Sequence, residues 1–196
     1  MKRQVLVLAL SALMAGFGLA ACQRNEQGVE AAREASPDRT STLTTADRDF
    51  IWKAAQSHQQ EIDMGHLGEQ KSTNSDIKDF ASMLVKDHES ALKDLNSLMD
   101  KYNAPQQGQL SKDQATIDHL NSMDLAEFDK NFLDMMVDGH NKALDAYRSA
   151  STTVQNADLK NHINDTIPTI EKHLNRAQQL QSQWSSTAPA KKTGTR

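Results

Sequence analysis

Hydrophobic residues recur in alternating steps of three and four along several long segments of the chain. Such spacing places them on one face of an α-helix, the face that packs into a core. The clearest segment carries Ile77, Ala81, Leu84, His88, Ala91, Leu95, Leu98 and Tyr102 at these positions. Asn74 or Ser75 can cap the start of this helix, and Pro105 prevents its continuation. The pattern predicts a helix over residues 75–102 with His88 on its core-facing side.

Three other segments show the same alternation and predict helices over about residues 45–72, 124–153 and 157–184. Their core-facing positions are Ile51, Ala54, His58, Glu61, Gly65 and Gly68 in the first, Leu125, Phe128, Phe132, Met136, His140, Ala143 and Tyr147 in the second, and Leu159, Ile163, Thr166, Ile170, His173, Ala177, Leu180 and Trp184 in the third. Glycines at two of these positions, Gly65 and Gly68, allow a neighbouring helix to approach closely. Each predicted helix thus carries one core-facing histidine.

Two stretches of the chain repeat each other at a constant offset of 82 residues, with no gap. Phe50, His58, Ile62, Asp63, Asn74, Asp76, Ile77 and Lys78 recur as Phe132, His140, Leu144, Asp145, Asn156, Asp158, Leu159 and Lys160. A repeat of this length indicates two copies of one helical hairpin. We therefore expect an all-α fold, an antiparallel four-helix bundle over residues 44–185.

The N-terminal segment has the pattern of a bacterial lipoprotein signal peptide. Lys2 and Arg3 precede an apolar run that ends in Leu19-Ala20-Ala21-Cys22. A charged start, a short apolar run and a small-residue cleavage site are typical of an export peptide. Cys22 is the only cysteine, and its position suits attachment of lipid, palmitate included. We expect residues 1–21 to be removed and the mature chain to be held at a membrane through Cys22.

Gln23 follows the cysteine, where an aspartate is associated with retention at the inner membrane of other bacteria. We therefore expect the outer membrane, with the protein on its periplasmic side. Residues 22–43 are polar and read as a flexible tether, and residues 186–196 as a disordered tail. Without Lys2 and Arg3, 20 basic and 26 acidic side chains remain from the 22 and 26 of the whole chain, which argues against nucleic acid as a partner.

The four core-facing histidines lie at similar heights in the predicted bundle. His58 is 16 residues before Asn74 and His88 is 14 after it. His140 is 16 residues before Asn156 and His173 is 17 after it. With tight turns at these asparagines, the heights differ by roughly 2–5 Å at about 1.5 Å per residue. The four imidazoles and Glu61 can therefore share one layer.

Two interpretations of this layer stay open. Imidazoles with one carboxylate form a common site for zinc, copper or iron, which predicts ligation by His88, His140 and His173 with Glu61 or His58. Asp87, Asp138 and Glu171 are close in sequence and could accept hydrogen bonds from the ligand rings. Alternatively, the histidines hydrogen-bond one another and Glu61 and only specify the packing.

The methionines are a weaker signal. Six remain after the signal peptide: Met64, Met83, Met99, Met123, Met135 and Met136. Thioethers can bind cuprous copper, but helical spacing favours core packing for most of them.

Several motifs together resemble those of domain-of-unknown-function family 4142, a group of bacterial envelope proteins with a ferritin-like bundle. The matching stretches include Glu61-Ile62-Asp63-Met64-Gly65, Lys86-Asp87-His88, Val137-Asp138-Gly139-His140 and Ile167-Pro168-Thr169-Ile170-Glu171-Lys172-His173. The resemblance covers about residues 45–183, implies a ferritin-like fold and supplies no activity. Glu61, His88, His140 and His173 match the family pattern, whereas His58 departs from it.

The chain also departs from di-iron ferritins, in which a glutamate precedes each ligand histidine by three residues. Val85, Val137 and Ile170 occupy those positions here, which disfavours ferroxidase chemistry. No acid–base pair beyond Glu61 is evident, so an enzyme is the least favoured class. We expect a lipid-anchored periplasmic protein that binds a transition-metal ion or small ligand. The alternative is a metal-free envelope or stress-related interaction module whose buried histidines are structural.

Overall fold

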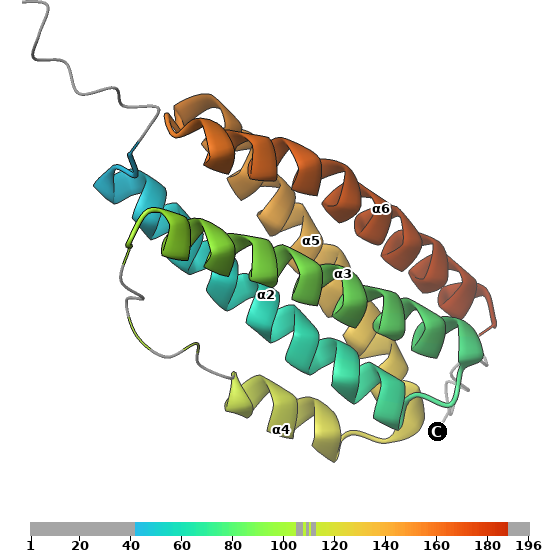
Figure 1. Ribbon diagram of the computed structural model, residues 1–196. Helices are drawn as coiled ribbons and strands as arrows, with labels where there is room; N and C mark the ends of the chain where they lie inside the picture. The colour runs from blue at the N-terminus through green and yellow to red at the C-terminus, as the bar shows by residue number, and fades with distance from the viewer. Residues whose placement is uncertain (1–41, 105–107, 109, 111–112, 188–196) are drawn as a thin grey trace, which may run out of the picture. The chain divides into compact units, whose positions relative to one another are not determined.

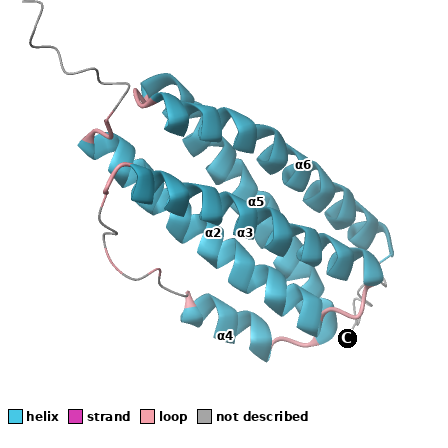
Figure 2. Ribbon diagram, in the orientation of Figure 1, coloured by secondary structure: helices cyan, strands magenta, loops and turns pink. Residues whose placement is uncertain are grey.

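A computed structural model describes residues 42–104, 108, 110 and 113–187 of the chain. Every regular element in these residues is a helix, so the fold is all-helical as the hydrophobic pattern predicts (Figure 2). None of the described helices is long and apolar enough to cross a membrane. The predicted signal peptide, the lipid site at Cys22, residues 22–41 of the tether and the end of the tail lie outside the described residues.

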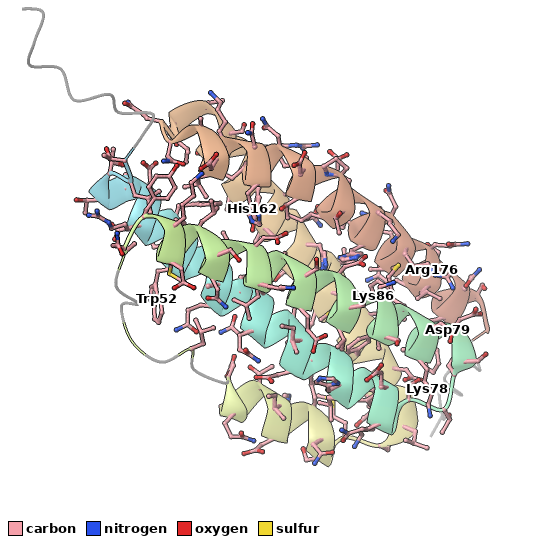
Figure 3. The ribbon with its side chains drawn as sticks, viewed as in Figure 1. Trp52, Lys78, Asp79, Lys86, His162 and Arg176 are labelled. Atoms are coloured by element: carbon pink, nitrogen blue, oxygen red, sulfur yellow. The ribbon has the colours of Figure 1, made fainter. Side chains whose placement is uncertain are left out.

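Four long helices occupy the segments with helical periodicity: α2 (Thr45–Lys71), α3 (Ser75–Lys101), α5 (Leu125–Thr153) and α6 (Ala157–Thr187). Each packs against two of the others, because α2 contacts α3 and α5, and α6 contacts the same two helices. Figure 1 shows these helices side by side. Exposed charged side chains such as Lys78, Asp79 and Lys86 lie on the outer surface of α3 (Figure 3).

A fifth helix, α4 (Gln114–Ser122), lies against α2 and α5 (Figure 1). The sequence pattern predicts no helix here, because nine residues are too few to show the alternation clearly. The side chain of Asp113 caps the start of α4 by accepting a hydrogen bond from the backbone of Thr116. Leu120 is fully buried and anchors α4 to the core.

Side-chain caps fix where the long helices begin. Asn74 accepts hydrogen bonds from the backbone N–H groups of Asp76 and Ile77 at the start of α3. Asn156 accepts one from Leu159 at the start of α6. These two asparagines are equivalent in the sequence repeat, and each is the last residue of a three-residue connection. Short capped connections fix the height of one helix against the next.

The apolar core has two parts, one towards each end of the long helices. The first part includes Ile51, Leu95, Tyr147, Leu159 and Ile163. The second includes Phe80, Leu84, Phe132, Leu133 and Leu180. Along α2, α3 and α5, the buried residues of one part precede the histidine and those of the other part follow it. A layer of four buried histidines, His58, His88, His140 and His173, therefore separates the two apolar clusters.

Gly68 lets α2 approach α3 and α5 closely. A Cβ atom at this position would lie 2.9 Å from the Cβ of Ala81 and 2.9 Å from the ring of Phe132. We expect Gly68→Ala to lower the free energy of unfolding by roughly 1–3 kcal/mol, because overpacking outweighs the gain in helix propensity. Urea denaturation measures this, with the exposed helical substitution Ser82→Ala as control. A Gly68→Ala protein as stable as the parent would show that the helices separate freely.

Candidate metal centre

Three histidines from three different helices meet in the polar layer. His88 lies on α3, His140 on α5 and His173 on α6, and at most 6% of each residue is exposed. Their ring centroids are 5.7 Å apart for His88 and His140, 5.2 Å for His88 and His173, and 5.3 Å for His140 and His173. We call these three residues the triad.

One nitrogen from each triad ring lies within 4.8 Å of the other two. Three buried nitrogens have no hydrogen-bond partner, and each belongs to a different ring: His88 Nε2, His140 Nε2 and His173 Nδ1. Three nitrogens that are each about 2.1 Å from one ion lie at most roughly 3.6 Å from one another when they are evenly spaced around it. Small side-chain movements therefore bring the three nitrogens within reach of one ion.

We call the hydrogen-bonded nitrogen of each triad ring its outer nitrogen and the unpartnered one its inner nitrogen. In two of the rings the outer nitrogen fixes the position of the ring proton. His140 Nδ1 donates to the backbone carbonyl of Met136 at 2.8 Å, and His173 Nε2 donates to the Asp87 carboxylate at 3.0 Å. Carbonyl and ionised carboxylate oxygens only accept hydrogen bonds, so in the neutral ring the proton lies on the outer nitrogen. The unpartnered nitrogens, His140 Nε2 and His173 Nδ1, then carry the lone pairs that a metal needs.

The third ring is held by a chain of two further residues. His88 Nδ1 and His58 Nδ1 are 2.8 Å apart, and His58 Nε2 is 2.8 Å from the hydroxyl of Tyr147. Either nitrogen of the histidine pair can hold the proton. When His88 Nδ1 donates, His58 Nε2 donates to Tyr147, and His88 Nε2 is left with its lone pair. In this arrangement each of the three unpartnered nitrogens carries a lone pair and is able to bind a metal ion.

Burial keeps the rings neutral. It lowers the pKa of His58 to about 3 and that of His140 to about 4, with neighbouring imidazoles adding to the effect. Burial likewise lowers the pKa values of His88 and His173, although Asp87 counteracts it for His173. Neutral imidazole is the form that binds metal, so at neutral pH no proton has to be removed first.

The structure does not bring His58 and Glu61 into the triad. Among the described residues, the set of side chains close enough to share an ion contains the three triad histidines alone. Both nitrogens of His58 are engaged by His88 and Tyr147, so this ring supports a ligand rather than acting as one. Glu61 instead lines a cavity with residues of α4 and α5.

The sequence indicates only some of the residues that hydrogen-bond the triad rings and their partner His58. Asp87 reaches a triad ring, whereas Asp138 pairs with Lys142 and Glu171 pairs with Arg148. The helical periodicity predicts a core position for Tyr147 but does not indicate its hydrogen bond to His58. Its position seven residues after His140 is the available signal, because a buried tyrosine hydroxyl needs a partner. His162, which is partly buried, lines a groove between α3 and α6 that also reaches Asp87 (Figure 3).

A family model described as Domain of unknown function (DUF4142) matches residues 32–180. No sequence among curated proteins matches the chain. A DUF305 fragment from Deinococcus radiodurans has a similar structure, with a TM-score of 0.65 and 12% identity over 72% of this chain and 99% of that chain. CopM in its Cu(I)-bound form gives a TM-score of 0.62 and 22% identity, covering 70% of this chain and 96% of CopM.

CopM in its Cu(II)-bound form gives a TM-score of 0.61 and 20% identity, covering 70% of this chain and 97% of that chain. At these identities the similarity shows a shared fold.

The hydrogen bonds of the triad predict which nitrogen of each ring is protonated. In metal-free protein at neutral pH, we expect His140 to be protonated on Nδ1 and His173 on Nε2, because their outer partners only accept hydrogen bonds. Two-dimensional NMR of ¹⁵N-labelled imidazoles distinguishes the two tautomers directly. The opposite tautomer in either ring would contradict the assignment of the inner nitrogens as ligands.

Acid should destabilise the metal-free fold. The pKa of His140 is about 4 in the folded protein and 6.5 in an unperturbed histidine. Between these pH values the unfolded chain therefore binds more protons than the folded protein does. The free energy of unfolding should therefore fall as the pH is lowered from about 6.5 towards 4. Burial raises the pKa of Glu61 from 4.5 to about 8. Between these pH values the folded protein holds the extra proton, so Glu61 alone would make the free energy of unfolding rise as the pH is lowered.

Urea denaturation at several pH values should thus show a steeper acid loss of stability in Glu61→Gln than in the parent chain. His140→Gln should reduce that loss. Stability that stays constant between pH 7 and pH 5 in the Glu61→Gln protein would mean that the rings are not held neutral.

Proposed function

This chain belongs to the DUF4142 family, and we propose that it binds one transition-metal ion through His88 Nε2, His140 Nε2 and His173 Nδ1. One observation carries the proposal: on three helices, three buried rings approach so closely that one nitrogen of each lies within 4.8 Å of the other two, and each ring has a buried nitrogen without a hydrogen-bond partner. Leaving a buried polar group unpaired costs about 1–3 kcal/mol. A single shared ion would satisfy all three nitrogens at once.

The competing interpretation is a metal-free interaction module whose histidines only specify packing. In that case we would expect the rings to satisfy one another, as His58 and His88 do through their Nδ1 atoms. The inner triad nitrogens are not satisfied in this way. The outer nitrogens of the same rings are all paired, which is the pattern of ligands oriented by their surroundings.

We propose copper ahead of zinc or iron. Three neutral imidazoles with no carboxylate suit a borderline transition metal and not a hard cation such as magnesium or calcium. Among divalent ions, copper binds such nitrogen ligands most strongly. The similarly folded CopM has been solved in Cu(I)-bound and Cu(II)-bound forms, which supports this choice.

We extend the proposal to the arrangement of the helices and to the location of the protein in the cell envelope. We propose that α2, α3, α5 and α6 form an antiparallel, ferritin-like four-helix bundle to which α4 is added. We also propose that lipid at Cys22 anchors the protein to the outer membrane, on the periplasmic side, as the Leu19-Ala20-Ala21-Cys22 stretch suggests. A metal-binding protein at that position would encounter ions that enter the periplasm.

Removal of two ligands should abolish binding. We expect untagged protein to hold one Cu(II) ion per chain after equilibrium dialysis without reductant, and His88→Ala, His140→Ala protein to lose it. The matched control is His66→Ala, His119→Ala, which removes two exposed histidines and should leave the content unchanged. Elemental analysis measures the metal, and circular dichroism shows whether each variant is folded.

Two results would contradict the proposal. One is equal copper content in the two double variants, which would mean that copper binds outside the triad. The other is an absence of copper from the parent protein together with a loss of stability in the His88→Ala, His140→Ala variant. That second result would support the packing interpretation.

A further inference from the structure

A cavity of about 190 Å³ lies between α2, α4 and α5. Its lining includes Glu61 and Met64 from α2, Ile117 from α4, and Met135, Met136 and Gly139 from α5. Figure 1 shows α4 beside α2, and α4 also contacts α5. None of the triad histidines lines the cavity, so it is separate from the proposed metal centre.

Glu61 presents an unsatisfied carboxylate at this cavity. Its Oε2 atom is inaccessible to solvent and has no hydrogen-bond partner. Its Oε1 atom lies against Gly139, where an added Cβ would be 3.1 Å away. A carboxylate in such surroundings is costly unless a positive charge or a hydrogen-bond donor accompanies it. In agreement, burial raises the pKa of Glu61 to about 8.

Three of the six methionines that follow residue 21 line the same cavity. Met64 and Met136 are buried, and Met135 is partly buried. Thioether sulfur is a soft ligand that prefers Cu(I) and chemically similar ions. Hard cations would require more oxygen ligands, but the nearby carboxylate of Asp138 pairs with Lys142 and that of Asp113 with Thr116.

We propose that this cavity is a second metal site, specific for a soft monovalent cation of the Cu(I) or Ag(I) type. The thioethers of Met64, Met135 and Met136 supply soft ligands. Glu61 is protonated in the metal-free cavity at neutral pH, so it releases its proton to solvent when the cation binds and then supplies the compensating negative charge. Gly139 keeps the space beside the carboxylate open, since any side chain there would approach Oε1. The proposal uses none of the triad residues, so the two sites can be tested independently.

The test follows methionine methyl groups of the full chain by NMR during titration with Ag(I) in chloride-free buffer. We expect the ¹³C-methyl signals of Met64 and Met135 to shift, while that of Met99 does not. Met99 is the internal control, because it is as buried as Met64, at 6% exposure, but belongs to the other apolar cluster. The same Met64 and Met135 shifts should persist in the His88→Ala, His140→Ala protein.

A matched pair of variants completes the test, since leucine replaces methionine with little change in volume. Met64→Leu should weaken Ag(I) binding at least tenfold, as should Glu61→Gln, whereas Met99→Leu should not change it. The proposal is overturned if Met64 and Met135 do not shift, or if Met99 shifts equally. It is also overturned if removal of the triad histidines abolishes the methionine shifts.

Discussion

The central constraint on the structure is the burial of three imidazole rings, each with an unpartnered nitrogen, between two apolar clusters. Each unpaired nitrogen is unfavourable in metal-free protein, and each belongs to a ring with almost no exposure. The apolar clusters on either side stabilise the bundle and hold the rings at one depth. The centre of the bundle therefore gives up stability that leucine or phenylalanine side chains would provide.

Hydrogen bonds to the outer nitrogens hold the three rings in orientations that suit metal binding. A backbone carbonyl, a carboxylate and a histidine–tyrosine chain each hold one ring by the nitrogen that faces away from the centre. These contacts orient the rings before any ion arrives, so little conformational freedom is lost on binding. Asp87 would have a further role if an ion binds to the triad, because its negative charge, hydrogen-bonded to His173, would lie close to the cation without being a ligand.

Helical periodicity and short connections explain what the sequence could predict. Alternation of three and four assigns His88, His140 and His173 to core-facing positions, and capped connections at Asn74 and Asn156 fix their heights. The height of a residue along the helix axis does not determine the direction of its side chain, however. Glu61 follows His58 by three residues, and its side chain faces α4, a helix too short to be evident from periodicity. The hydrogen bond of Tyr147 was equally inaccessible, because it joins α5 to α2 across the core.

The central claim is that one ion can bind to the triad, and anomalous diffraction tests it most directly. Crystals of untagged protein soaked with Cu(II) should be measured on both sides of the copper absorption edge. We expect an anomalous peak in contact with His88 Nε2, His140 Nε2 and His173 Nδ1. A structure with no peak there, and with copper only at exposed histidines such as His66 or His119, would contradict it.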